Sequence, residues 1–95
     1  MLKHKNKYLE IPSAQIDLHG LTKEEARIAL GDFLTEAERR KYKKIRIITG
    51  KGLHSASGRG ILNEYIKKIL DDKGLKYRDA KINEGGEGAV DVEIF

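Results

Sequence analysis

Apolar and polar residues alternate in several short stretches of the chain, and a period of two is typical of β-strands with one buried face. The first stretch stops before Gly20 and the second before Thr49. The last one alternates three aliphatic residues with Asp91 and Glu93, which we expect to face solvent. The pattern predicts four strands, at residues 15–19, 45–48, 76–82 and 90–94.

Two longer stretches carry apolar residues three and four positions apart, which is helical spacing. In the first, Thr22 followed by Glu25 forms a capping-box signature, and we expect a helix from about residue 22 to 41. In the second, an apolar stripe covers residues 61–70, and Gly74 fits the position just after a helix. The spacing therefore predicts two amphipathic helices.

The predicted elements follow the order βαβαββ, in which the first two strands each lead into a helix. Such strands are expected to be parallel, and right-handed crossovers place both helices on one face of the sheet if the strands progress without reversal. The last two strands are separated by the Gly-rich turn at 83–88 and should form a hairpin. We predict a single two-layer α/β domain over residues 15–95, preceded by a basic N-terminal arm at 1–14.

Composition narrows the class of protein without identifying it. The 95 residues are 39% hydrophobic and 36% charged, which is typical of one small folded domain rather than a disordered chain. The absence of cysteine excludes disulfides, iron–sulfur clusters and cysteine-based zinc sites. The longest apolar runs are too short to span a membrane, and the N-terminus lacks the apolar core of a secretory signal. We expect a cytoplasmic protein with no membrane partner.

Charge is distributed unevenly along the chain. The formal net charge is +4, but residues 43–68 hold seven basic residues against Glu64 alone, a net of +6. This excess favours a polyanionic partner, although a solvated helix face and loop would carry the same charges.

Two separate stretches are expected to meet at one edge of the sheet. The carboxyl ends of parallel strands lie together, and open α/β sheets commonly build ligand sites there. Asp17 and His19 lie at the end of the first strand, and Lys51 and His54 follow the second. Two residues apart in a strand, the carboxylate of Asp17 and the imidazole of His19 share a face and could orient a nucleophile and transfer a proton. Alternatively, Asp17 accepts backbone N–H groups and His19 packs beside Gly20.

The stretch at 50–60 has the composition of a phosphate-binding loop. Its glycines allow backbone N–H groups to turn inward, its end opens a helix, and its basic side chains attract phosphate oxygens. It matches neither the Walker A pattern nor the dinucleotide-binding pattern, so we expect no nucleotide cofactor. An ordinary flexible connection remains the alternative. The candidate phosphate-binding residues are Gly50, Lys51, Gly52, His54, Ser55 and Arg59.

A divalent metal ion is a weaker hypothesis. Asp17, His19 and His54 could in principle form a three-ligand site, but no H-E-x-x-H motif supports it. We therefore assign no residue as a metal ligand.

Three motifs in these stretches resemble one known family. Residues 16–20, Ile-Asp-Leu-His-Gly, resemble the (L/I)-D-L-H-G signature of the Smr (small MutS-related) domain. Residues 49–52, Thr-Gly-Lys-Gly, resemble its (H/T)-G-x-G motif, and residues 85–89, Gly-Gly-Glu-Gly-Ala, are similar to its G-G-x-G-A turn. The resemblance covers residues 15–95 and is closest to free-standing bacterial members or to the C-terminal domain of a MutS paralogue.

The resemblance implies a four-stranded mixed sheet with two helices on one face, similar to the C-terminal domain of the third translation initiation factor. It also implies nucleic-acid binding and endonuclease activity, with Asp17 and His19 in catalysis and Gly50, Lys51 and Gly52 at the glycine motif. A non-catalytic module that binds nucleic acid or the ribosome is the alternative. The choice between RNA and DNA, the need for metal, the identity of the base and the oligomeric state stay open.

Overall fold

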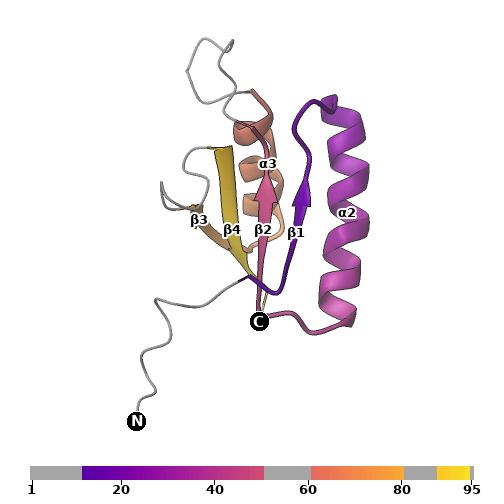
Figure 1. The fold of residues 1–95 in the computed structure, drawn as a ribbon, viewed down its shortest axis with the longest axis vertical. Helices are drawn as coiled ribbons and strands as arrows, with labels where there is room; N and C mark the ends of the chain where they lie inside the picture. Colours follow the sequence, from indigo (N-terminus) through magenta and orange to yellow (C-terminus); the bar gives the residue numbers. More distant parts are fainter. Residues whose placement is uncertain (1–11, 51–60, 81–87, 95) are drawn as a thin grey trace.

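The computed structural model describes residues 12–50, 61–80 and 88–94, and it contains the predicted βαβαββ order (Figure 1). Residues predicted as a phosphate-binding loop at 51–60 lie outside the described residues. No helix in the described part is long and apolar enough to cross a membrane. The elements are β1 (Ala14–Asp17), α2 (Lys23–Arg39), β2 (Lys44–Ile48), α3 (Ile61–Asp72), β3 (Lys76–Asp79) and β4 (Ala89–Glu93).

The four strands form one mixed sheet in the order β1-β2-β4-β3. β1 and β2 are parallel, whereas β4 runs antiparallel to both of its neighbours. β3 therefore runs in the same direction as β1 and β2, so both helical crossovers progress the same way along the sheet. The predicted antiparallel pairing of the last two strands is confirmed, and β4 lies between β2 and β3. Residues 83–87 of the predicted turn between them lie outside the described residues.

One hydrophobic core joins the two helices to one face of the sheet. Strand residues at alternate positions, such as Ile45 with Ile47 and Val90 with Val92, are completely buried. They pack with residues that recur at helical spacing on α2 and α3. The fully packed cluster comprises Leu18, Ala26, Leu30, Leu34, Ala37, Ile45, Ile47, Ile66, Leu70, Val90 and Val92.

The predicted capping box begins α2. The Glu25 backbone N–H donates to Thr22 Oγ1 at 3.1 Å, and the Thr22 N–H donates to Glu25 Oε1 at 3.0 Å. Two donors that the first helical turn would otherwise leave without partners are thus satisfied.

Both helices end in the same hydrogen-bonded turn, which requires one residue with positive φ. In α3 this residue is Gly74 (φ 74°), as predicted, and in α2 it is Lys41 (φ 60°). The following N–H, of Leu75 and of Tyr42, donates at 3.0 Å to the carbonyl five residues earlier. This is the Schellman arrangement, in which glycine normally occupies the left-handed position.

Asp91 is buried, and the prediction that it faces solvent is wrong. Its side chain is 1% exposed and accepts two hydrogen bonds from the Arg46 guanidinium, at 2.7 and 3.0 Å. Lys44 Nζ lies 4.0 Å from the same carboxylate. Because β4 is an interior strand, Asp91 has β2 on one side, where Arg46 is its register partner. Because β4 is a central strand, the side chain of Asp91 is covered by its neighbours and forms a buried ion pair with Arg46.

Candidate active site

A carboxylate and an imidazole contact each other just after β1. Asp17 is the last strand residue, and His19 Nδ1 lies 2.6 Å from Asp17 Oδ1. The His19 backbone N–H donates to the same oxygen at 3.1 Å. Between them, Leu18 is buried and donates its N–H to the Ile48 carbonyl at 2.7 Å, which holds the turn against β2. Gly20, with φ 84°, then redirects the chain toward α2.

The contact arises from a turn rather than from a shared strand face. We predicted that the strand continues through His19, whereas β1 ends at Asp17. The two side chains nevertheless meet, and both remain accessible, with 52% of Asp17 and 67% of His19 exposed. Solvent or a ligand can therefore reach the pair.

The geometry assigns different tasks to the two nitrogens of His19. An ionised carboxylate only accepts hydrogen bonds, so Nδ1 carries the hydrogen in its contact with Asp17. Nε2 is then the ring nitrogen left to accept or release a proton. Asp17 fixes the orientation and the tautomer of the ring, as an orienting carboxylate does for a general base.

Hydrogen bonding keeps Asp17 ionised. The pKa of Asp17 lies below its usual value, chiefly because its side chain accepts the His19 ring N–H and secondly because it accepts the His19 backbone N–H. A pKa that is lower in the folded than in the unfolded chain contributes stability above the unfolded pKa, and this is lost as pH falls through the folded pKa. The pair is thus intact at neutral pH.

Replacing His19 by Ala is expected to raise the pKa of Asp17 toward its usual value near 3.8. The ring donor is lost, whereas the backbone N–H of residue 19 remains, so the return should be partial. The measurement is an NMR titration of the Asp17 carboxyl group in both proteins. Glu24, whose pKa is lowered by Arg27, provides an internal control that should not move. An unchanged Asp17 pKa would contradict the contact.

The end of β2 lies directly against His19. Gly50 has φ 82°, and a Cβ placed on it would be 3.1 Å from the Cβ of His19. Only a residue without a side chain fits this approach without moving its neighbour. The ends of the two parallel strands therefore meet at one edge, and the segment that begins at Gly50 starts beside the Asp17–His19 pair.

Replacing Gly50 by Ala should therefore disturb both folding and the position of His19. An L-residue with positive φ costs roughly 1–2 kcal/mol, and the new methyl group must also displace the His19 backbone or side chain. Gly74→Ala is the matched control, since its φ is 74° and nothing lies within 4 Å of its added Cβ. We expect urea denaturation to show a larger loss of stability for Gly50→Ala, with the Asp17 and His19 side-chain NMR signals shifted only in that variant. Equal losses and unshifted signals would contradict the close approach.

A buried polar network fixes the end of β2 from the other side. Asn63 Nδ2 donates to Thr49 Oγ1 at 3.2 Å, and both residues are buried. The backbone N–H groups of Thr49 and Gly50 both donate to the Gly88 carbonyl, at 2.8 and 3.1 Å. The first turn of α3, the end of β2 and the residue before β4 are thereby tied together.

Sequence reasoning did not single out Asn63. It is polar, so it was not counted with the apolar residues that identified the second helix. The available signal was its spacing, because Asn63, Ile66 and Leu70 follow one line of the helix and all three are buried.

The structure places three of the predicted site residues and brings them together, namely Asp17, His19 and Gly50. Lys51, Gly52, His54, Ser55 and Arg59 lie outside the described residues, so their roles stay predictions. Within the described part, no group of three or more acidic, histidine or cysteine side chains is arranged to hold a metal ion.

A comparison with known protein families shows which family this chain belongs to. The family model of the Smr domain matches residues 16–94, which is almost the whole chain. This chain belongs to the Smr domain family.

Relatives of this Smr domain are found in bacteria. An uncharacterized protein of Treponema pallidum is 48% identical over 83 residues, covering 84% of this chain and 40% of that protein. Endonuclease MutS2 of Bacillus mycoides is 35% identical over 82 residues, covering 86% of this chain but 10% of the relative. The chain thus spans less than half the length of the curated relatives it matches, and it is related to the Smr domains of MutS2 endonucleases.

Solved structures of the family share the fold. The Smr domain of Thermus thermophilus MutS2 superimposes with a TM-score of 0.74 at 32% identity, covering 84% of this chain and 95% of that one. YdaL, a stand-alone small MutS-related protein of Escherichia coli, gives a TM-score of 0.79 at 27% identity, covering 98% and 76%. The predicted mixed sheet with two helices is therefore confirmed as the Smr arrangement.

Proposed function

We propose that this Smr domain binds nucleic acid and cleaves its phosphodiester bonds at the edge formed by Asp17, His19 and Gly50. The observation that carries the proposal is the 2.6 Å contact between Asp17 Oδ1 and His19 Nδ1 at an exposed strand end. It leaves His19 Nε2 free for proton transfer beside a Gly-rich, basic segment. The name endonuclease, which belongs to the MutS2 relatives, supports the same reaction class.

In the proposed reaction, His19 Nε2 takes the proton of the attacking hydroxyl. On RNA this is the 2′-hydroxyl, whose oxygen bonds to phosphorus while the bond from phosphorus to the 5′-oxygen breaks. The leaving 5′-oxygen takes a proton from water and His19 releases its proton to solvent, so the products are a 2′,3′-cyclic phosphate and a 5′-hydroxyl. On DNA, water must supply the attacking oxygen, and the products are a phosphate and a hydroxyl end.

Charge develops on the phosphoryl oxygens during either attack and needs positive groups nearby. We propose that Lys51 and Arg59, with backbone N–H groups around Gly50 and Gly52 and the side chains of His54 and Ser55, make these phosphate contacts. The glycine-rich and basic composition of the segment that begins at Gly50 supports this assignment.

The described residues fit a divalent cation poorly. Asp17 Oδ1 already accepts two hydrogen bonds from His19, and no third ligand accompanies this pair among the residues that the structure describes. We therefore propose a reaction without a metal ion and expect cleavage to continue when divalent cations are removed.

The test is incubation of the wild-type protein with end-labelled single-stranded RNA, single-stranded DNA and branched DNA, with and without EDTA. We expect cleavage of at least one substrate in EDTA, and the product ends identify the attacking oxygen. Cleavage that requires added metal would contradict the metal-free mechanism.

Binding without cleavage is the second candidate function, favoured by the net charge of +6 over residues 43–68. A module of this kind, acting on free nucleic acid or on the ribosome, should lose affinity steeply with salt and leave every substrate intact. If the protein neither cleaves nucleic acid nor binds it in a salt-dependent way, both proposals are contradicted. A protein-interaction domain would then be the remaining function.

A further inference from the structure

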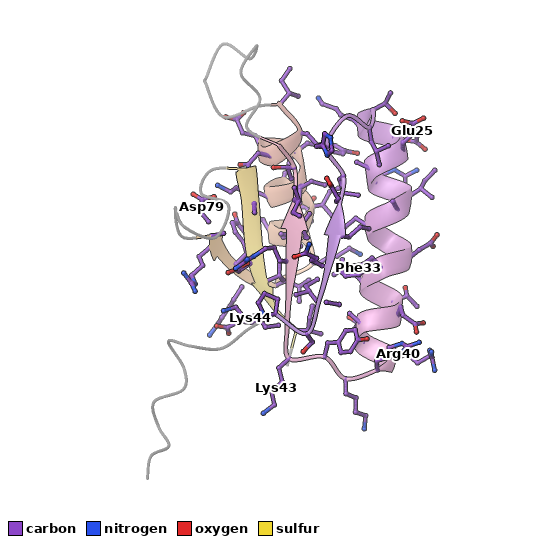
Figure 2. The ribbon with its side chains drawn as sticks, viewed as in Figure 1. Glu25, Phe33, Arg40, Lys43, Lys44 and Asp79 are labelled. Atoms are coloured by element: carbon purple, nitrogen blue, oxygen red, sulfur yellow. The ribbon has the colours of Figure 1, made fainter. Side chains whose placement is uncertain are left out.

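Four exposed basic residues lie close together at the end of the molecule remote from the Asp17–His19 pair. We call this group the cationic turn, and it consists of Arg39, Arg40, Lys41 and Lys43. It spans the last turn of α2 and the connection to β2. In Figure 2, Arg40 and Lys43 lie at one end of the molecule, and Glu25, in the first turn of α2, lies at the other.

Local pairing neutralises only part of this charge. Glu36 accepts hydrogen bonds from both Arg39, at 2.6 Å, and Arg40, and these two guanidinium groups lower the pKa of Glu36 to about 2. One carboxylate thus serves two guanidinium groups. Within the described residues, Lys41 and Lys43 form no ion pair.

Helix electrostatics account for only part of the cationic turn. Basic side chains at the end of a helix interact favourably with its carbonyl groups, and this explains Arg39. Lys41 directly follows the C-cap residue Arg40 and lies at the same carbonyl end. Lys43 lies four residues beyond the last helical residue, past the turn over which the effect falls off.

The backbone of Lys41 provides an independent observation. Lys41 has φ 60° in the same hydrogen-bonded turn in which α3 uses Gly74. A lysine in this conformation is strained relative to glycine, and such strain tends to mark residues retained for function. The turn after α2 thus has a lysine at the position where the turn after α3 has glycine, the residue that this backbone conformation favours.

A polar path connects the cationic turn to the Asp17–His19 pair. The Ser13 N–H donates to the Lys44 carbonyl at 2.8 Å, so β1 begins beside the cationic turn. Asp17 is paired with Ile48, five residues after Lys43, which corresponds to roughly 17 Å of strand. Ser13 and Gln15, between the two ends of this path, are exposed and uncharged.

We propose that the cationic turn binds the phosphate backbone of the same nucleic-acid strand that the Asp17–His19 pair acts on, several nucleotides from the bond that is cleaved. The proposal rests on the proposed function. A separation of roughly 17 Å corresponds to about five base pairs along a duplex, so only an oligonucleotide can occupy both places. A polymer of regularly spaced phosphates fits two separated cationic sites better than one compact anion does.

The experiment compares the double variant Lys41→Gln/Lys43→Gln with its parent, both carrying Asp17→Asn so that cleavage of the ligand is slowed during the measurement. Binding of labelled 12-nucleotide RNA and DNA is followed by fluorescence anisotropy over a range of salt. Two lost phosphate contacts should lower the log–log salt slope by roughly 1.4–1.8 and weaken binding about 30-fold at 0.1 M salt. A dinucleotide, with one phosphodiester, should bind both proteins equally.

Lys68→Gln/Arg78→Gln is the matched control, because it removes two exposed charges from α3 and β3 instead. It should weaken binding much less. Lys41→Gly gives a second readout, since relief of the positive φ should raise the melting temperature while affinity for the 12-nucleotide ligand falls.

The outcomes separate the two proposals. Equal losses in the two double variants, or a deficit that persists with the dinucleotide, would overturn the role of the cationic turn alone. If the parent binds neither RNA nor DNA at low salt, the proposed function fails as well.

Discussion

His19→Ala is expected to slow phosphodiester cleavage by 10²- to 10⁴-fold, the range that a positioned proton-transfer group contributes. His19 Nε2 is the group assigned to proton transfer, because the 2.6 Å contact with Asp17 occupies Nδ1. Folding should persist, since 67% of the His19 side chain is exposed and removing it opens no cavity. The measurement is kcat/KM on the cleaved substrate, with circular dichroism to verify the fold.

Asp17→Asn should also slow cleavage, but through His19. The amide keeps the shape of the carboxylate and removes the charge that fixes the ring tautomer and stabilises the protonated ring. If Asp17 is such a positioning residue, the double variant Asp17→Asn/His19→Ala should be no slower than His19→Ala alone, because residues acting as a unit are not additive.

Glu24→Gln is the control for charge, since Glu24 is another exposed carboxylate, in the first turn of α2, and it pairs with Arg27. Its activity should equal that of the wild type. Additive losses at residues 17 and 19 would assign an independent task to Asp17, such as holding a cation, and would refute the orienting role.

Asp91→Asn should destabilise the domain by about 3–5 kcal/mol, the effect of removing one partner from a buried ion pair. Asp91 is 1% exposed and accepts two hydrogen bonds from Arg46, with Lys44 nearby, so the amide removes a buried negative charge and one of the two acceptors that the Arg46 guanidinium contacts. A total stability near 5–15 kcal/mol is typical of single domains, so this is a large fraction of it. Urea denaturation of both proteins gives the difference.

The double variant Arg46→Met/Asp91→Leu distinguishes the ion pair from simple packing. Replacing both partners with apolar side chains removes the desolvation penalty together with the attraction, and such exchanges are often neutral or stabilising. We expect it to recover part of the stability that Asp91→Asn loses, because Lys44 keeps its charge beside residue 91. A double variant as unstable as the single one would mean that Arg46 contributes through contacts other than Asp91.

Most of the fold was predictable because local chemistry and periodicity agreed. Thr22 and Glu25 marked the start of α2, and Gly74 marked the turn after α3, as the hydrogen bonds of both turns confirm. The place of β4 was not predictable in this way. A strand that follows β3 through a turn can pair on either side of it, and only the packing of the whole sheet decides between them.

That one ambiguity explains the main error about burial. Alternation along β4 placed Asp91 opposite the core, which is correct, but a strand in the interior of a sheet has neighbours on both sides. Its register partner on β2 is Arg46, and this pairing depends on contacts 45 residues apart in sequence. A local pattern carries no information on such a contact.

At the first strand, the sequence predicted that Asp17 and His19 lie together. It did not predict how their side chains come into contact. The Asp-x-His spacing suggested contact through a strand face, whereas Gly20 and the buried Leu18 produce it through a turn. Gly50 could be placed beside His19 because parallel strands end at one edge. Asn63 escaped notice because a polar residue in a helix is usually solvated.

The central position of β4 also sets the order in which the domain can be completed during synthesis. Among the strands that the structure describes, β3 pairs only with β4, and β4 is made after it. Until Ala89–Glu93 has left the ribosome, β2 has an open edge, β3 has no strand partner, and the carboxylate of Asp91 has not reached Arg46. The nascent chain should therefore fold in one late step, and degradation by cellular proteases should be fastest for released chains truncated before residue 88.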